Sequence, residues 1–232
     1  MLNHAAQRHA LLNCTLFTAM RPEDLNGILS LISERSVRRG QTIFQKGDIA
    51  SSMMAVLKGS VRISTSSPDG KEVTLNTIRA GEVFGEIAML DGRPRSADAT
   101  AAEDCDLAVI DRRHFLPFLL SNQDLLLRML AVLCQRVRET SRALEDLAML
   151  DLPGRLARLL LRLADDHGSP APDGIRIEFK LSQRDIGTRV ASTRESVNKQ
   201  LQVWRDAGWL SLNQGYITLR RTEPLRRLCQ TD

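Results

Sequence analysis

The sequence of 232 residues predicts an α+β protein in which short strands come first, a long helix follows, and a winged helix-turn-helix ends the chain. Three features support this prediction. Short apolar runs alternate with turn residues after position 40, an apolar repeat in steps of three and four begins near position 121, and two short helix patterns meet at a tight break near position 191. We expect three successive segments in the chain, residues 1–121, 122–151 and 152–232.

The N-terminal region is expected to open with two short helices and then to change to strands. The apolar residues that indicate the first helix are Leu11, Leu12, Leu16 and Phe17. Pro22, followed by acidic residues, begins a second helix whose apolar positions reach Ile32. The expected strands are Thr42–Phe44, Met54–Leu57, Val61–Ile63 and Val73–Leu75, separated by glycine-containing turns. Many short strands at this spacing predict a small sandwich or barrel.

A heptad pattern runs along the helix that is expected to begin near Ser121. The residues of this seam are Leu126, Leu130, Leu133, Val137, Thr140, Leu144 and Leu147. The pattern predicts a coiled-coil contact between two copies of the helix, with 122–151 as the dimerisation segment. The alternative is one amphipathic helix packed on its own domain. Leu152-Pro153-Gly154 is expected to break the helix, and 165–174 is expected to form a loop.

Two short helices with a tight break at Ala191-Ser192 are expected in the C-terminal region. Ser182 caps the first helix and Thr193 caps the second. Their buried faces consist of Ile186 and Val190 in the first helix and of Val197, Leu201 and Trp204 in the second. Residues 209–219 then alternate around Gly215, as the hairpin wing of a winged helix-turn-helix would.

The second of these helices carries the residues that we expect to contact DNA. Arg194 suits the O6 and N7 atoms of guanine, Glu195 suits the N4 group of cytosine, and Lys199 reaches another base edge or a phosphate. Gln183, Thr193 and Ser196 are positioned to contact DNA phosphates. Such contacts fix the position of the protein on the DNA but do not recognise its base sequence. The alternative is that these side chains are solvent-exposed residues of an ordinary helix surface and do not contact DNA.

A second informative segment runs from Gly85 to Ala97 and reads GEIAMLDGRPRSA. A glycine that opens a short helix frees backbone amides for an anion. Glu86 is placed to accept hydroxyl groups, and Arg95 to bind a phosphate with its planar fork. The alternative is a surface salt bridge between Glu86 and Arg95.

This cassette, inside its strand region, resembles the phosphate-binding cassette of cyclic-nucleotide-binding domains. Together with the long helix and the winged helix-turn-helix, nearly the entire chain resembles the catabolite activator/fumarate-nitrate regulator family of bacterial transcription factors, and the cyclic-AMP receptor protein branch in particular. The resemblance implies an N-terminal β-roll (jelly-roll-like) that binds a cyclic nucleotide and a homodimer that regulates transcription.

The resemblance also implies the residues of the ligand site. Those assigned to the phosphate and the ribose are Gly85, Glu86, Arg95 and Ser96. Thr140 and Ser141 would meet the purine amino edge, one from each subunit. Cyclic AMP is the expected allosteric ligand, acting through a hinge near 151–154. Cyclic GMP is one alternative, and a regulator that binds DNA without a small ligand is another.

The implied partners are a second copy of the chain and double-stranded DNA with a near-palindromic operator, whose successive major grooves lie about 34 Å apart. RNA polymerase is a further partner of the family, although the segment 165–174, where the family touches it, differs here in length and composition. Lys199 stands at a position where the catabolite activator of this family has an arginine. A lysine cannot form the two parallel hydrogen bonds of an arginine, so we expect relaxed specificity at the base that this residue contacts. Asn198 replaces a small residue and adds a polar contact.

The charge distribution and the cysteine content limit which other classes of function are possible. From Arg155 onward the chain has 14 Lys and Arg against 9 Asp and Glu, whereas the first 154 residues have 18 against 19, so the last third suits a polyanion. No run approaches the roughly 18 apolar residues that span a bilayer, and no secretory signal opens the chain, so we expect a cytoplasmic protein without membrane contact. The scattered cysteines and histidines form no metal-binding or catalytic pattern, so we expect neither a metal nor an enzyme.

Overall fold

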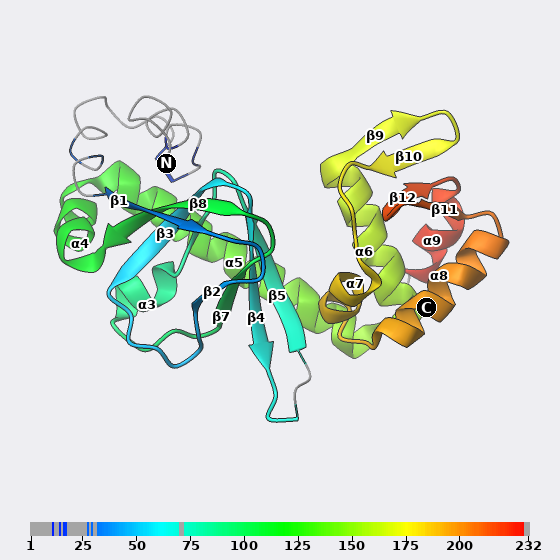
Figure 1. Cartoon of the computed structure of the whole chain (residues 1–232), viewed down its shortest axis with the longest axis horizontal. Coiled ribbons are helices and arrows are strands. Elements are labelled where there is room, and N and C mark those ends of the chain that lie inside the picture. The colour runs from blue at the N-terminus through cyan, green and yellow to red at the C-terminus, as the bar shows by residue number, and fades with distance from the viewer. Residues whose placement is uncertain are drawn as a thin grey trace. The chain divides into compact units, whose positions relative to one another are not determined.

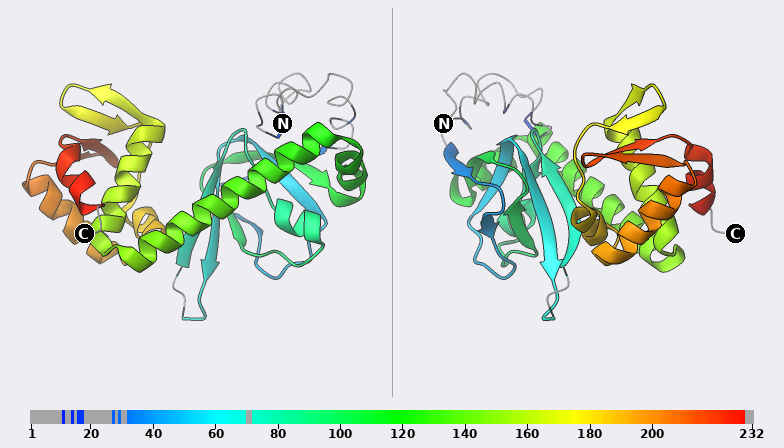
Figure 2. Two further views of the ribbon diagram at one scale, coloured as in Figure 1. Left: turned by 180° about the vertical axis from the view of Figure 1, so that it is seen from behind. Right: turned by 45° about the vertical axis from the view of Figure 1, so that its right-hand side comes forward.

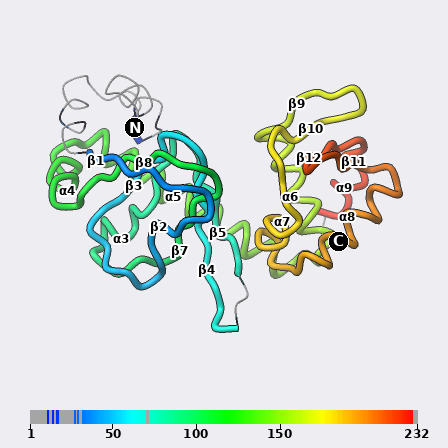
Figure 3. Tube along the Cα trace, in the orientation of Figure 1, coloured from blue at the N-terminus to red at the C-terminus, as the bar shows by residue number. Residues whose placement is uncertain are grey.

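The computed structural model describes residues 11, 14, 16, 17, 27, 29, 32–69 and 72–229. The chain divides into two compact units, one made of Met1–Ser67 and Leu75–Val137 and the other of Pro68–Thr74 and Arg138–Asp232. The ribbon in Figure 1 shows strands as the main content of the first unit and helices as the main content of the second, and Figure 3 traces the path of the chain through the same elements. The α+β class predicted from the sequence is confirmed.

The first unit is built on two four-stranded sheets, with the strand orders β1-β8-β3-β6 and β2-β7-β4-β5. The strands are β1 (Ile32–Val37), β2 (Thr42–Phe44), β3 (Ser52–Lys58), β4 (Ser60–Ser66), β5 (Glu72–Arg79), β6 (Val83–Phe84), β7 (Asp98–Ala101) and β8 (Cys105–Asp111). The four strands predicted between positions 42 and 75 all occur, as β2, β3, β4 and β5. The predicted β-roll is therefore confirmed.

Strand β3 shows why the sequence contains an unbroken apolar run at this point. Met53 and Ala55 belong to a core cluster shared with helices, whereas Met54 and Val56 belong to the core between the two sheets. Successive side chains of a strand point to opposite faces, so a strand that is covered on both faces is apolar at every position. The sheet that contains β3 is therefore the middle layer of the unit.

Helices cover the outer face of this middle sheet. Helices α3 (Glu86–Asp91), α4 (Arg112–Ser121) and α5 (Gln123–Met149) contribute Met89, Phe115 and Met129 to the shared core. Figure 2 shows α5 as one continuous helix. Only its N-terminal turns are buried in this unit, because the next fully buried residue along α5 is Asp146.

The expectation that the second N-terminal helix reaches Ile32 is wrong. Ile32 begins strand β1 and pairs with Ile110 of β8. Pairing with a strand that lies more than seventy residues later overrides the helical spacing of the apolar residues. Gly27 and Leu29 are helical, whereas Leu12 and residues 18–26 lie outside the described residues.

The second unit consists of helices that pack against a four-stranded sheet of order β11-β12-β10-β9. Its elements are α6 (Leu152–His167), β9 (Gly168–Ala171), β10 (Gly174–Ile177), α7 (Gln183–Arg189), α8 (Arg194–Asp206), β11 (Leu210–Asn213), β12 (Tyr216–Leu219) and α9 (Thr222–Leu228). All residues predicted for the buried faces of the two short helices belong to this core.

Two predicted boundaries in this region are wrong. The predicted break between two helices exists but falls at Leu150-Asp151: helix α5 ends at Met149, and Leu152-Pro153-Gly154 forms the first turn of α6. Proline is tolerated there because the first N–H groups of a helix have no helical acceptor. The expected loop at 165–174 is instead the end of α6 and most of a β9–β10 hairpin. Strand β10 also pairs with the distant β12, a partner that local sequence does not reveal.

Candidate functional site

The short helix α3 begins at a glycine in the left-handed conformation. Gly85 has φ 76° and ψ 10°. A Cβ atom at this position would lie 2.5 Å from Nη1 of Arg95. Gly85 therefore serves both the turn into α3 and the close approach of the arginine.

Arg95 is buried, with only 6% of its surface exposed. Its Nη1 donates to the Gly85 carbonyl at 2.9 Å, and its Nη2 donates to the Ser52 carbonyl at 2.7 Å. The guanidinium carbon lies 4.1 Å from the ring centroid of Phe44. Burial lowers the pKa of Arg95, while nearby carboxylates oppose that shift. The side chain remains a cation, because the pKa of arginine starts far above neutrality.

Glu86, the first residue of α3, is also buried, with 4% of its surface exposed. Its Oε1 lies 3.8 Å from Nε of Arg136 in α5, and Nη2 of Arg136 donates to the Val83 carbonyl at 3.0 Å. Burial raises the pKa of Glu86, and a hydrogen bond from its own backbone N–H, followed by the charges of Arg136 and Arg95, partly offsets that rise. The alternative of a surface salt bridge between Glu86 and Arg95 is wrong, because Glu86 is buried and its ion pair is with Arg136.

Sequence reasoning missed three residues of this cassette. Phe44 comes from β2, Ser52 from β3 and Arg136 from α5, so they meet Arg95 and Glu86 only in the folded unit. None of them stands in a local pattern that points to the cassette. For Arg136, the only indication in the sequence is weak: it is an arginine next to the apolar seam of a predicted helix.

The remaining residues assigned to the nucleotide are exposed. Ser96 follows Arg95 directly and is open to solvent. Thr140 and Ser141 are exposed on α5, four and five residues beyond Arg136, in the part of the helix that belongs to the second unit. Within the first unit, the structure brings Gly85, Glu86 and Arg95 together at the start of α3.

The helix-turn-helix has the two caps that the sequence predicts. The side chain of Ser182 accepts from the Asp185 N–H at 3.0 Å and caps α7. The side chain of Thr193 accepts from the Ser196 N–H at 3.1 Å and caps α8. Each cap satisfies an amide that the first turn of a helix leaves without an acceptor.

The turn between α7 and α8 is tight at two backbone positions. Ala191 has a positive φ of 50°. The Ser192 N–H donates to the Gly187 carbonyl at 2.9 Å, and a Cβ atom at Gly187 would lie 2.8 Å from the Ser192 oxygen. A glycine at 187 therefore lets the turn close against α7.

The polar face of α8 is open to solvent at the positions expected to read bases. Arg194, Glu195 and Lys199 are all exposed. Glu195 and Lys199 lie on the side opposite the buried Val197 and Leu201, and Arg194 is exposed in the first turn of the helix. A pocket at the start of the helix is lined by Gln183, Thr193, Arg194, Glu195 and Asn198. The fold thus places Gln183 of α7 beside the first turn of α8.

The residues assigned to phosphates are already oriented by bonds within the motif. The hydroxyls of Thr193 and Ser196 lie 2.9 Å apart and share one hydrogen bond. That bond uses one of their two O–H donors, so the other remains for a phosphate oxygen. Nε2 of Gln183 donates to Oδ1 of Asn198 at 2.8 Å, which fixes both amides.

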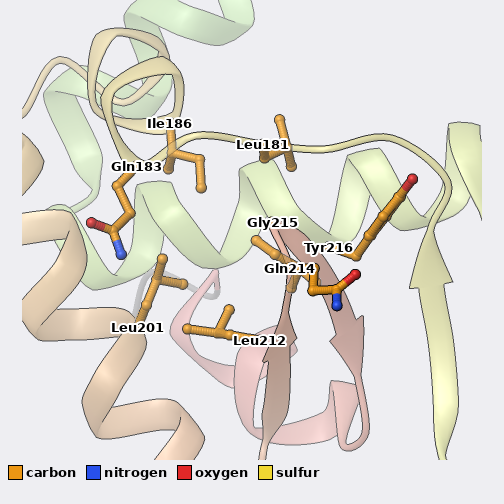
Figure 4. Close-up of a pocket in the computed structure, with 9 residues that line it drawn as sticks. Leu181, Gln183, Ile186, Leu201, Leu212, Gln214, Gly215 and Tyr216 are labelled. Carbon is orange, nitrogen blue, oxygen red and sulfur yellow. The ribbon is translucent and has the colours of Figure 1, made fainter.

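The wing is the β11–β12 hairpin. Its two turn residues, Gln214 and Gly215, have φ values of 50° and 88°, as a two-residue hairpin turn requires. A cavity of about 160 Å³ lies beneath it, and Figure 4 shows apolar side chains from α7, α8 and the wing around this cavity. Its walls are Leu181, Gln183, Ile186, Leu201, Leu212, Gln214, Gly215, Tyr216 and Ile217.

Two cations that sequence reasoning did not single out stack on the wing. The guanidinium carbon of Arg176 lies 4.1 Å from the ring centroid of Tyr216, and Nζ of Lys180 lies 5.7 Å from it. They add positive charge to the hairpin side of the motif. In the sequence they are visible only as part of the basic balance of the last third.

Among the described residues, no three His, Cys, Asp or Glu side chains gather as a metal site. Burial raises the pKa of Cys14 to about 11 and also raises that of Cys105, so both thiols are protonated at neutral pH. In the described part of the chain, no single helix is long and apolar enough to cross a membrane. The pair α4 and α5, bent by 111°, meets that criterion only when the two helices are taken together.

Two family models match the chain. The cyclic nucleotide-binding domain matches residues 34–122, and the Crp-like helix-turn-helix domain matches residues 154–228. The first match contains the cassette from Gly85 to Ser96, and the second contains α6 to α9 with the wing.

Relatives and solved structures agree with these matches. The "cAMP-activated global transcriptional regulator CRP" of Pasteurella multocida is 34% identical over 172 residues, which are 73% of this chain and 81% of that protein. A CooA mutant from Carboxydothermus hydrogenoformans has a TM-score of 0.79 at 25% identity and covers 92% of this chain and 97% of its own. The c-di-GMP responsive global regulator CLP of Xanthomonas campestris shares the fold, with a TM-score of 0.76 at 23% identity over 86% of this chain and 99% of its own.

The named relatives of this chain are transcriptional regulators and not enzymes. Their likeness covers both units, and each unit has its own matching domain model. The chain therefore belongs to the catabolite activator/fumarate-nitrate regulator (CRP/FNR) family of transcription regulators, with a cyclic nucleotide-binding domain and a Crp-like helix-turn-helix domain.

Proposed function

We propose that this chain is a cyclic-AMP-responsive transcription regulator that binds a specific DNA sequence as a homodimer. The observation that carries the proposal is the pair of buried, opposite charges at the start of α3, Glu86 and Arg95, in a chain that also has an exposed recognition helix. Burying charged groups costs free energy, and perturbed charges of this kind concentrate at functional sites. A ligand with both hydroxyl groups and a phosphate uses both charges.

The arrangement suits a cyclic nucleotide in detail. Arg95 has five N–H donors, and its bonds to Gly85 and Ser52 leave donors for a phosphate oxygen. The exposed hydroxyl of Ser96 adds another donor, and Glu86 accepts the ribose hydroxyl. Thr140 and Ser141 supply hydroxyls for the purine edge. The relative from Pasteurella multocida is named for activation by cAMP, whereas CLP is named for its response to c-di-GMP, so the two ligands and cyclic GMP need direct comparison.

The dimer is proposed to form through 122–151. Along the predicted seam of α5, Leu130 and Leu147 are each 47% exposed, Val137 is 65% exposed and Leu144 is 67% exposed. Apolar side chains repeated every seven residues bury this surface when a second helix packs against it. A homodimer also presents two recognition helices to the two halves of a near-palindromic operator.

Calorimetry followed by DNA-binding assays tests the proposal. Cyclic AMP is expected to bind and to raise the affinity for operator DNA by the roughly 5- to 150-fold that is typical of allosteric coupling. Arg95→Ala should abolish the nucleotide response and leave weak, salt-sensitive nonspecific DNA binding. Arg93→Ala, at an exposed position two residues away, is the control and should behave as wild type. Unchanged nucleotide affinity in Arg95→Ala overturns the cassette assignment.

A regulator that binds DNA without a small ligand is the second candidate. One observation favours it: Glu86 already pairs with Arg136, and Arg95 already donates to Gly85 and Ser52. This second candidate is supported if the affinity for operator DNA is the same with and without each nucleotide.

The wider setting follows from the proposed function. The division into 1–121, 122–151 and 152–232 assigns ligand binding, dimerisation and DNA binding to successive segments. Double-stranded DNA in the bacterial cytoplasm is the target, without membrane contact. RNA polymerase is the remaining candidate partner, and the β9–β10 hairpin occupies the segment through which the family touches it.

A further inference from the structure

Asn198 lies one turn into α8, beside the two residues that open the helix. It comes four residues after Arg194 and three after Glu195, a spacing that places the three side chains next to one another on the helix surface. The side chain is half-buried and lines a cavity of about 420 Å³ together with Gln183, Thr193, Arg194 and Glu195. Asn198 therefore borders the same cavity as the residues proposed to read guanine and cytosine.

Two glutamine amides hold the side-chain oxygen of Asn198. Nε2 of Gln183 in α7 donates to Oδ1 of Asn198 at 2.8 Å. Nε2 of Gln202, one turn further along α8, donates to the same atom at 3.4 Å. An amide oxygen has two lone pairs, so these two donors occupy both of them. The oxygen of Asn198 is therefore used within the helix-turn-helix.

The side-chain nitrogen of Asn198 has no such partner in the described part of the chain, where its Nδ2 group donates to no atom. This group carries two N–H donors. Because the oxygen is already occupied, Asn198 offers a ligand in the cavity two donors and no acceptor.

This arrangement distinguishes between the bases of DNA. In the major groove guanine presents two acceptors, thymine presents one, adenine presents an acceptor beside a donor, and cytosine presents a donor. An asparagine commonly pairs with adenine through both its oxygen and its nitrogen, which requires a free oxygen. The bonds from Gln183 and Gln202 occupy that oxygen. The two remaining donors suit guanine best, thymine next and cytosine least.

We propose that Asn198 is a further specificity-determining residue, which selects guanine and, after it, thymine at the base that it contacts. Gln183 is the positioning residue that sets this choice, because it holds the oxygen of Asn198 away from the base. A phosphate contact of Gln183 is compatible with this role, since its amide keeps a second N–H donor. The inference rests on the proposed sequence-specific DNA binding.

Selection of bound duplexes from a library of randomised DNA, followed by sequencing, tests the role of Asn198 without a known operator. The full chain is used with cyclic AMP and, separately, without nucleotide. Wild type should enrich guanine at one position of each half-site where Asn198→Ala shows no preference. The affinity of Asn198→Ala for the guanine-containing duplex should fall about fivefold, as expected for one net hydrogen bond.

Two further variants complete this test. Asn198→Asp has no N–H donor, and a carboxylate accepts from N4 of cytosine, so cytosine should replace guanine at the same position and strand. Gln200→Ala is the control. Gln200 is only two residues from Asn198 but on a different side of α8, so this variant should keep the wild-type motif.

Gln183→Glu tests the positioning role. A carboxylate only accepts hydrogen bonds, so the Asn198 amide has to turn, donate from Nδ2 to the carboxylate and present its oxygen to the DNA. The preferred base should then change from guanine to cytosine or adenine, which present a donor. Loss of a phosphate contact alone would lower the affinity for all sequences equally.

Three results overturn the proposal. A wild type that prefers adenine or cytosine at the position altered by Asn198→Ala presents its oxygen to the base. A motif that is the same in wild type, Asn198→Ala and Asn198→Asp shows that Asn198 reads no base. A motif unchanged in Gln183→Glu removes the positioning role. A wild type that enriches no sequence in either selection refutes the proposed function as well, whereas a clear motif that ignores Asn198 refutes this inference alone.

Discussion

At the scale of single residues, the two buried charges of the cassette are satisfied to different degrees. Arg95 makes short hydrogen bonds to two carbonyl oxygens and stacks on Phe44. The Glu86 carboxylate accepts a hydrogen bond from its own backbone N–H, and its ion pair with Arg136 spans 3.8 Å, which is too long for a hydrogen bond. Glu86 is therefore the charge whose burial is less well compensated, in agreement with its raised pKa.

Glu86→Gln should make the stability of the nucleotide-free protein less sensitive to pH. Burial raises the pKa of Glu86 above the ordinary value of 4.5, so the folded state holds the proton more tightly than the unfolded chain does. The stability contributed by this group is present below that ordinary pKa and is lost as the pH rises through the folded-state pKa. The unfolding free energy of Glu86→Gln minus that of wild type should thus grow from about pH 4 to pH 7 in urea denaturation. A constant difference would contradict the assignment, and Glu103→Gln, at an exposed position, is the control.

Ala191→Gly should stabilise the helix-turn-helix. The φ of 50° at Ala191 costs an L-residue roughly 1 kcal/mol, and glycine removes that strain, although it also increases the freedom of the unfolded chain. We expect a net gain of up to about 1 kcal/mol by calorimetric unfolding. Ala207→Gly is the matched control, because Ala207 is right-handed with φ −76° and should lose stability on substitution. Equal losses at both positions would show that the turn is unstrained.

At the scale of elements, the recognition helix and its cap are local features, and local sequence was enough to predict them. Thr193 accepts the Ser196 N–H, the apolar residues face α7, and the charged residues face solvent. Strands β1 and β10 were not predicted, because each pairs with a strand far along the chain. Within the described residues, strand β9 pairs only with β10, in a hairpin that was expected to be a loop. The contacts of Arg155 and Arg158 in α6 were missed because their acceptors are distant in sequence: Asp146 on α5 and the carbonyls of Val190 and Cys229, which follow α7 and α9.

Arg194→Ala should cost about 1–3 kcal/mol in binding at one cognate base pair and should relax specificity there. The side chain lies in the exposed first turn of α8, where a guanidinium can form two bonds with a guanine. Competition binding with operator point variants measures this effect. Arg205→Ala, near the other end of α8 and paired with Asp206, is the control and should leave base preference unchanged. An equal loss on every sequence would make Arg194 a phosphate contact.

At the scale of the whole molecule, the seam of α5 is an apolar surface that the described part of one chain leaves exposed. Leucine and valine side chains at heptad spacing stay exposed from Leu130 to Leu147. A repeat of this kind predicts pairing with a second helix, and among the described residues these side chains remain exposed. The exposed seam is therefore the physical basis of the proposed homodimer.

Leu144→Glu should shift the protein toward monomer in analytical ultracentrifugation. A fully buried leucine contributes roughly 1.5–3 kcal/mol, and a symmetric dimer loses two of them, so the dissociation constant should rise about a hundredfold or more. Leu120→Glu is a matched control, because Leu120 on α4 is also 67% exposed but lies outside the seam. An unchanged dimer in Leu144→Glu would move the interface away from the seam.

The sequence by itself determined the α+β class, the short strands after position 40, the heptad seam, and the caps and faces of the helix-turn-helix, because these depend on residues close together in the chain. The tertiary structure alone decided which side chains surround the cassette and how the end of α5 is held. Phe44, Ser52 and Arg136 reach Arg95 and Glu86 from three separate elements. Asp146 meets Arg158 and Arg162 only when α6 folds back against α5. Contacts of this kind depend on burial and on the packing of distant elements, which no local pattern encodes.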